Sequence, residues 1–136
     1  MNVIEAHGLT KSYGTGGGRV EALRGVDLQV DDAALVAIMG PSGSGKSTLL
    51  HILGGVEVPT TGQVLLEGTD LASLDDDQRT LIRRRRIGFI FQAFNLLPTF
   101  TALENVTLPL LLDGISNAEA DRRAAEMLDL VGLGHR

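Results

Sequence analysis

The chain has 136 residues, of which 43% are hydrophobic and 21% charged, and its formal net charge is −5. This length and apolar content are sufficient for one domain with a hydrophobic core, whereas the acidic balance argues against nucleic acid as a partner. The sequence holds no cysteine, which excludes disulfides, thiolate metal ligands and cysteine nucleophiles.

Neither a secretory signal nor a membrane span is expected. Residues 1–5 lack the basic region and the long apolar segment of a signal peptide. No stretch approaches the roughly 20 apolar residues that cross a bilayer. We therefore expect a cytoplasmic protein, which would reach a membrane only through a partner.

The first third of the chain has the pattern of a small antiparallel sheet. Residues 3–6 are mostly apolar, a glycine-rich turn lies at residues 15–18, and Val26, Leu28 and Val30 then alternate with polar residues. Strand, turn and strand in this order predict a hairpin. We expect the hairpin to lead into a further strand at residues 35–39.

Residues 40–47, Gly-Pro-Ser-Gly-Ser-Gly-Lys-Ser, satisfy the pattern G-x-x-x-x-G-K-[ST] at every fixed position. The apolar run at residues 33–39 has the length of a buried strand, and residues 47–53 suit a helix. Strand, glycine-rich loop and helix thus follow one another as a phosphate-binding loop requires. A simple glycine-rich turn is the alternative, and the complete match favours nucleotide binding.

The residue types in this loop explain how it would hold phosphates. Its glycines let main-chain N–H groups approach an anion without a Cβ in the way, and the helix start directs its positive dipole end at the same place. Lys46 would reach the β- and γ-phosphates, and the Ser47 hydroxyl would ligate Mg²⁺. The candidate binding residues are Gly40, Pro41, Ser42, Gly43, Ser44, Gly45, Lys46, Ser47 and Thr48.

The middle of the chain continues the mixed α/β pattern. Residues 59–62 predict a turn and residues 63–68 a short strand. Residues 70–85 resemble a helix with Ser73 as its candidate cap, and residues 87–91 form another apolar run of strand length. Gln92 follows that run directly.

Two groups of charged or titratable residues carry no predicted site. The run Arg83–Arg86 lies at the end of the expected helix, where basic residues compensate the dipole, and this interpretation is favoured over a phosphate or lipid clamp. His7, His51 and His135 are too scattered in sequence to indicate metal-ligand spacing.

From residue 93 onward, helix segments are separated by breakers, among them Pro109 within residues 101–112. Residues 117–131 form a better helix, with Ser116 as N-cap and apolar residues at 124, 127, 128 and 131. This change divides the chain into a mixed α/β part, residues 1–92, and the opening of a helical part, residues 93–136.

Several segments together resemble the ATP-binding subunit of an ABC transporter. They are residues 9–13, 22–26, 40–47 and 87–92, while residues 91–98 and 101–106 are most similar to the lipoprotein-release and macrolide-export type. The resemblance covers the whole chain. It implies an α/β fold, namely an incomplete P-loop NTPase (ABC ATPase) core with an amino-terminal antiparallel β-subdomain and the start of a helical subdomain.

The resemblance assigns ATP and Mg²⁺ as cofactors and adds two site residues. Tyr13 matches the aromatic residue that stacks on adenine, although a half-buried strand residue is the alternative. Gln92 matches the glutamine that reaches Mg²⁺ and the attacking water, although a polar strand end is the alternative. Ser47 and Gln92 are thus the candidate metal ligands.

The resemblance also implies partners. Such a subunit couples ATP binding and hydrolysis to export or lipoprotein release through a transmembrane permease, on the inner face of the cell membrane. It would form a head-to-tail homodimer in its full-length form.

Three features of the family are not found in these 136 residues, namely the Leu-Ser-Gly-Gly-Gln signature, the Asp–Glu pair after an apolar strand, and the switch histidine. Residues 110–113 imitate the Asp–Glu strand, but Pro109 disfavours a central strand and Gly114 stands where glutamate is required. We therefore expect a truncated chain without a catalytic residue, and either a gap in the sheet or marginal stability.

Two other functions compete with a transport ATPase. One is a nucleotide-binding module that does not hydrolyse ATP. The other is a small-molecule phosphotransferase, for which Arg83–Arg86 would be the only candidate lid.

Overall fold

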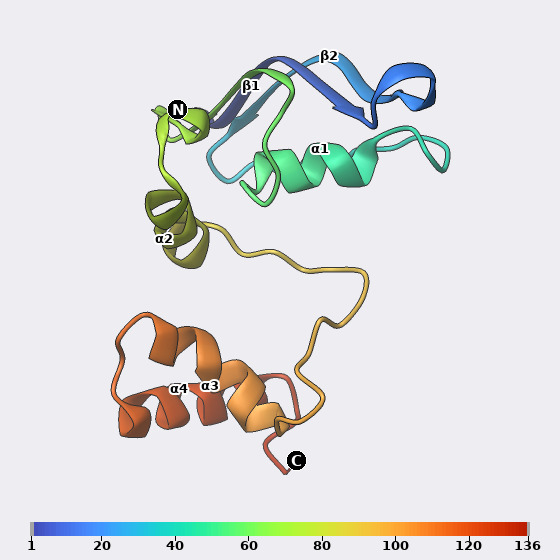
Figure 1. Ribbon diagram of the computed structural model, residues 1–136. Helices are drawn as coiled ribbons and strands as arrows, with labels where there is room; N and C mark the ends of the chain where they lie inside the picture. Colours follow the sequence, from blue (N-terminus) through green and yellow to red (C-terminus); the bar gives the residue numbers. More distant parts are fainter. Residues whose placement is uncertain (1, 136) are drawn as a thin grey trace. The chain divides into compact units, whose positions relative to one another are not determined.

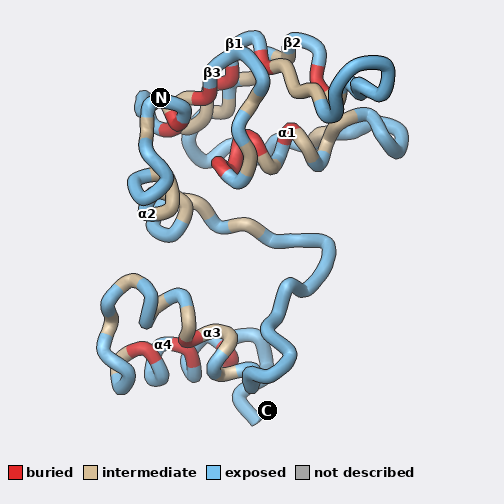
Figure 2. Tube along the Cα trace, viewed as in Figure 1, coloured by how far each residue is buried: buried red, intermediate tan, exposed pale blue. Residues whose placement is uncertain are grey.

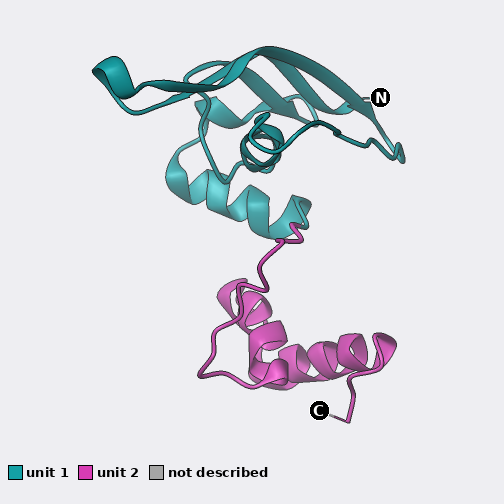
Figure 3. Cartoon of the chain, turned by 90° about the vertical axis from the view of Figure 1, so that its right-hand side faces the viewer, with its two compact units in different colours: residues 1–88 teal, residues 89–136 magenta. Residues whose placement is uncertain are grey.

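The computed structural model describes residues 2–135, and the chain divides into two compact units, residues 1–88 and residues 89–136 (Figure 3). In chain order the elements are β1 (Asn2–Tyr13), the short 3-10 helix η1 (Gly16–Gly18), β2 (Val20–Asp31), α1 (Lys46–Leu53), β3 (Thr61–Leu66), β4 (Thr69–Asp70), η2 (Leu71–Ser73), α2 (Asp76–Arg86), α3 (Ala102–Leu112) and α4 (Asn117–Leu130).

The first unit is built on a four-stranded antiparallel sheet with the order β2-β1-β3-β4. The central strand β1 pairs Ala6 with Leu28 of β2 on one side and with Val64 of β3 on the other. The predicted hairpin and the predicted strand after the turn are therefore confirmed. Helix α1 runs along one face of this sheet (Figure 1).

The core of the first unit lies between that sheet face and α1 (Figure 2). The buried residues are Ala6, Leu9, Leu23, Val64 and Leu66 from the strands, Leu49, Ile52 and Leu53 from α1, and Leu71. Leu49, Ile52 and Leu53 recur at the spacing of one helix face, which explains why α1 forms here. The helix that begins at the glycine-rich loop is thereby fixed to the sheet.

Two strands predicted from apolar runs do not form. Residues 34–40 and 87–91 have no strand assignment, and Leu35 is 100% and Ile90 97% exposed. An apolar run becomes a strand only when neighbours satisfy its N–H and C=O groups. Among residues 2–135 no strand pairs with either run, so the two strands between which a gap in the sheet was expected do not form.

The predicted start of the next helix is also wrong. Helix α2 begins after Asp75, whose carboxylate accepts a hydrogen bond from the N–H of Gln78, while the Gln78 side chain accepts one from the N–H of Asp75. This reciprocal capping box is a stronger start signal than a lone serine. Ser73 instead lies in η2 and donates to the carbonyl of Asp70.

The second unit packs α3 against α4. Helix α3 is continuous through Pro109 and begins with a capping box of Thr101 and Glu104. Helix α4 buries Ala120, Ala124 and Leu128, whereas Met127 and Val131, which were predicted to share that face, are exposed. The three buried residues follow one another at intervals of four positions and therefore lie along one face of α4.

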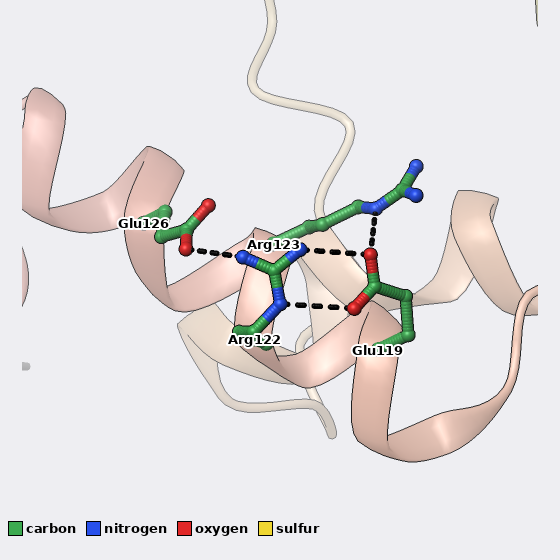
Figure 4. A network of polar contacts seen from close by, with 4 residues as sticks. All are labelled: Glu119, Arg122, Arg123 and Glu126. Carbon is green, nitrogen blue, oxygen red and sulfur yellow. Dashed lines mark hydrogen bonds and ion pairs between the residues drawn. The ribbon is translucent and has the colours of Figure 1, made fainter.

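A network of charged side chains lies on the exposed face of α4 (Figure 4). Arg122 donates to both carboxylate oxygens of Glu119, at 2.8 and 2.9 Å, and Arg123 donates to one of them at 2.6 Å. These hydrogen bonds, with Arg122 contributing most, lower the pKa of Glu119 from 4.5 to about 2. The carboxylate therefore stabilises the folded helix only while it is ionised.

We expect Glu119→Gln to lower the helicity of the chain at neutral pH, with a difference from the parent that disappears on acidification. Because the folded pKa is depressed, the stabilisation is fully present above about pH 4.5 and is lost as pH falls to about 2. Far-UV circular dichroism between pH 7 and pH 2 measures both effects. Glu126→Gln, which removes a single partner of Arg122, should show a smaller change, and an equal change in both variants would contradict the assignment to Glu119.

Candidate functional site

The glycine-rich loop, residues 40–45, joins the irregular segment after β2 to the first turn of α1 (Figure 1). Gly43 has φ +78° and Gly45 has φ +92°. Both values lie in the left-handed region, which residues with a Cβ adopt only at a cost of about 1–2 kcal/mol. The loop conformation therefore favours glycine at position 45, which the pattern fixes, and also at position 43, which the pattern leaves open.

Gly45 also lies in close contact with the sheet. A Cβ on Gly45 would stand 2.4 Å from the carbonyl oxygen of Ala22 in β2. Ala22 is an extra residue in its strand, since Lys11 pairs with Leu23 and Ser12 with Glu21. This bulge is thus the place at which the sheet holds the end of the loop, in keeping with the tendency of bulges to lie beside functional sites.

The other two loop glycines differ in their surroundings. A Cβ on Gly40 would come within 2.7 Å of the Ser44 hydroxyl oxygen, so the loop is tightly folded at that point. A Cβ on Gly43 would meet no protein atom within 4 Å. Gly43 therefore presents its backbone to open space, as an approach by a ligand requires.

The ammonium group of Lys46 is folded back over the loop. It donates to the carbonyl oxygens of Gly40 at 2.9 Å and Pro41 at 2.7 Å, and to the Ser44 hydroxyl at 3.3 Å. A positive charge is thus held at the centre of the loop by neutral acceptors. Because the N-cap Gly45 has no side chain, it leaves the first N–H groups of α1 without a side-chain acceptor.

The remaining predicted loop residues lie around this centre. The N–H of Ser44 donates to the Pro41 carbonyl at 3.3 Å, which closes a turn that includes Ser42. Ser47 is exposed and Thr48 half-buried in the first turn of α1. The structure therefore gathers the predicted loop residues into one exposed, donor-rich turn at a helix start.

Tyr13 ends β1 opposite Val20, two residues along β2 from the bulge that holds Gly45. Its side chain is 40% exposed, and its hydroxyl donates to the Glu57 carboxylate at 2.8 Å. The ammonium group of Lys11 lies over its ring, 5.2 Å from the ring centre. Tyr13 and the loop therefore approach the same stretch of the β1–β2 hairpin.

Sequence reasoning missed Lys11 and Glu57 as part of this neighbourhood. Residues i and i+2 of a strand share a face, so Lys11 beside Tyr13 could have been found from the sequence. Glu57 lies 44 positions further along the chain, and no local pattern connects it to Tyr13. Burial acts to raise the pKa of Glu57, but the hydrogen bonds from Tyr13 and Lys11 outweigh it and lower that pKa overall.

Gln92 is exposed and belongs to the second unit, outside the helices and strands. Its predicted approach to the loop of the first unit stays a prediction. Arg83 is half-buried, contrary to the expected solvated face, because its guanidinium donates to the carbonyl of Gly55 and to the Thr80 hydroxyl. Arg86 binds the carboxylate of Glu67, so Arg83 and Arg86 both hold groups of the protein itself.

Comparisons with known proteins give consistent results. A family model described as ABC transporter matches residues 23–136. An uncharacterized ABC transporter ATP-binding protein of Thermotoga maritima is 52% identical over 134 residues, which are 98% of this chain and 57% of that protein. The lipoprotein-releasing system ATP-binding protein LolD of Roseobacter denitrificans is 50% identical over 135 residues, 98% of this chain and 60% of that protein.

The fold has a counterpart among solved structures. The dimeric ATP-binding cassette MJ0796, in a post-hydrolysis state bound to ADP and Pi, matches with a TM-score of 0.86 and 46% sequence identity, over 93% of this chain and 56% of that chain. This chain thus spans somewhat more than half the length of these relatives. None of the helices within residues 2–135 has the length and apolarity to cross a membrane.

Proposed function

Because this chain belongs to the family of ABC transporter ATP-binding proteins, we propose that it is the ATP-binding subunit of a transporter, or part of one, which holds Mg-ATP at residues 40–48. The predicted α/β P-loop fold with an antiparallel β-subdomain is confirmed by the likeness to MJ0796. The observation that carries the proposed site is the conformation of the loop, with Gly43 and Gly45 left-handed and Lys46 at its centre.

The loop fits a nucleoside triphosphate because it offers donors that lack strong acceptors. Lys46 donates only to neutral oxygens, which phosphate oxygens would replace with stronger, charge-assisted hydrogen bonds. The free N–H groups at the start of α1 add a positive dipole end. Mg²⁺, when bound, would supply the charge that neutralises the phosphates, with Ser47 and Gln92 as its protein ligands.

Tyr13 would hold the adenine base by stacking. Its ring is partly exposed and lies on the strand that flanks the bulge beside Gly45. An aromatic ring provides a flat apolar surface without demanding a particular base edge. The hairpin would thus carry the base contact and also hold the loop that binds the phosphates.

The transport side of the proposal rests on the relatives. LolD proteins are named for a lipoprotein-releasing system, so lipoprotein release or a related export process is the proposed use of ATP. We propose a transmembrane permease as partner, a position on the cytoplasmic face of the membrane and a head-to-tail homodimer, the last supported by the dimeric state of MJ0796. No nucleic-acid partner is proposed.

For the 136-residue chain itself, we propose nucleotide binding without hydrolysis. The sequence contains no Asp–Glu pair after an apolar strand, and the only imitation of it, residues 110–113, lies at the end of helix α3. The acceptors that Lys46 and the Ser44 N–H bind in the loop are carbonyl and hydroxyl oxygens. The chain would therefore lack a general base for the attacking water.

We expect Ser47→Ala to remove most of the Mg²⁺ dependence of ATP binding by the purified chain. The parent should bind ATP more tightly with Mg²⁺ than with EDTA, and this difference should be much smaller in the variant, because one of the two proposed metal ligands is gone. Calorimetric titration measures the affinities, and phosphate release measures turnover in the same samples.

Ser116→Ala serves as the control for this substitution. Ser116 lies in the second unit and makes no side-chain capping bond, so its variant should keep the Mg²⁺ dependence of the parent. Equal Mg²⁺ dependence in Ser47→Ala and the parent would refute the role of Ser47. Lys46-dependent phosphate release by the parent chain would refute binding without hydrolysis.

A further inference from the structure

One carboxylate connects two side chains of β1 in the first unit. Glu57, in the segment between α1 and β3, accepts from the Tyr13 hydroxyl through Oε2 at 2.8 Å and pairs with the Lys11 ammonium through Oε1 at 3.0 Å. Lys11 also donates to the Val58 carbonyl at 2.7 Å. Both Lys11 and Glu57 are well covered, with side chains 15% and 27% exposed, so the three groups form a fixed cluster.

This cluster restrains both rotations of the tyrosine side chain. The hydroxyl lies on the long axis of the ring, so its bond to Glu57 fixes where that axis points but leaves the ring free to spin about it. The Lys11 ammonium over one ring face, at 5.2 Å from the ring centre, restrains the spin through a cation–π contact. One face is thereby covered by Lys11, while Tyr13 as a whole stays 40% exposed.

Glu57 is bound in turn to the helix that carries the phosphate loop. The N–H groups of Val56 and Glu57 donate to the carbonyl of His51 in the last turn of α1, at 2.8 and 3.1 Å. The first turn of the same helix begins at Lys46. Helix α1 therefore holds the loop at its first turn and, through Glu57, the Tyr13 ring at its last turn.

We propose that Glu57 is a positioning residue that sets the Tyr13 ring for stacking on a nucleobase, and that it thereby contributes to affinity for nucleotides but not for bare phosphate chains. This inference rests on the proposed function, since it requires that Tyr13 contacts the base. A ring that is already oriented loses less freedom on binding, so the contact costs less to form. Glu57 itself touches neither base nor phosphate.

The test compares Mg-ATP with Mg-tripolyphosphate, which has the phosphates but no base. Affinities of the full 136-residue chain are measured for the parent, Glu57→Ala, Glu57→Gln, Tyr13→Ala and the double variant Tyr13→Ala/Glu57→Ala. We expect Glu57→Ala to weaken ATP binding about 3- to 10-fold, which is the cost of ordering one side chain on binding. Tripolyphosphate binding should be unchanged, and Glu57→Ala should have no further effect once Tyr13 is alanine.

Intrinsic fluorescence gives a second measurement, which should stay unchanged if Glu57 only stabilises the fold. The chain has one tyrosine and no tryptophan, so its intrinsic emission reports on Tyr13 alone. Loss of the carboxylate acceptor in Glu57→Ala or Glu57→Gln should change that emission before any ligand is added. Glu21→Gln removes the same charge from β2, where Glu21 makes only ion pairs at 3.8 Å, and should leave emission and ATP affinity unchanged.

The outcomes separate this inference from the proposed function. Unchanged ATP affinity in Tyr13→Ala would overturn the base contact and the inference with it. Weaker ATP binding in Tyr13→Ala but not in either Glu57 variant would overturn the inference alone. Equal weakening of ATP and tripolyphosphate in Glu57→Ala would show that Glu57 supports the loop rather than the ring, and would also overturn it.

Discussion

Replacing Gly45 with alanine is expected to bring ATP binding by the 136-residue chain below detection, a loss of more than about 100-fold. Two costs coincide at this position. An alanine at φ +92° is strained by about 1–2 kcal/mol, and its Cβ would stand 2.4 Å from the Ala22 carbonyl oxygen, where ordinary contact begins at 3.4 Å. The first turn of α1 would have to move by about 1 Å, and its N–H groups would turn away from the loop.

Gly68→Ala is the control, because it introduces the backbone strain without the close contact. Gly68 has φ +80° in the turn between β3 and β4, and a Cβ there would meet nothing within 4 Å. Its variant should lose about 1 kcal/mol of stability through strain and keep its ATP affinity. Calorimetry gives the affinities and circular dichroism verifies that both variants are folded. Parent-like ATP binding in folded Gly45→Ala would show that the contact with Ala22 does not hold the loop.

Lys46→Ala is expected to weaken Mg-ATP binding by about 10- to 150-fold, because hydrogen bonds to charged groups contribute about 1.5–3 kcal/mol. The substitution acts on two states of the loop. Without a ligand it removes the donor that holds the carbonyls of Gly40 and Pro41. With ATP it removes the only ammonium group in the loop, and tripolyphosphate binding should fall by a similar factor.

A change of net charge alone must be excluded as the cause. Arg24→Ala removes one positive charge from β2, where Arg24 is 79% exposed and its nearest carboxylate, that of Glu21, lies at 3.8 Å. This variant should bind ATP nearly as the parent does, since exposed charges are screened by salt. Similar losses in Arg24→Ala and Lys46→Ala would assign the effect to general electrostatics and remove Lys46 from the site.

The proposed site is shared between segments that differ in how firmly they are held. The loop is bound to α1 and to the bulge in β2, and α1 is anchored by Leu49, Ile52 and Leu53. The apolar residues 34–39, which lead into the loop, pair with no strand within the part of the chain that the structure describes. The binding experiments therefore also measure how far the hairpin and α1 by themselves preserve the loop.

Several features could be predicted from the sequence by itself. The hairpin follows from alternating apolar residues around a glycine-rich turn, and the loop and α1 follow from eight consecutive residues at 40–47. The ABC family and the fold followed from the same motifs. These features are local, because dihedral preferences and side-chain periodicity act over a few residues.

Other features were decided only by the tertiary structure. The apolar runs at 33–39 and 87–91 read as strands, yet a strand exists only where another strand accepts its hydrogen bonds. The contact of Gly45 with Ala22 and the bond of Tyr13 to Glu57 join residues 23 and 44 positions apart. Such contacts depend on how the chain folds back on itself, and no short-range pattern in the sequence records that.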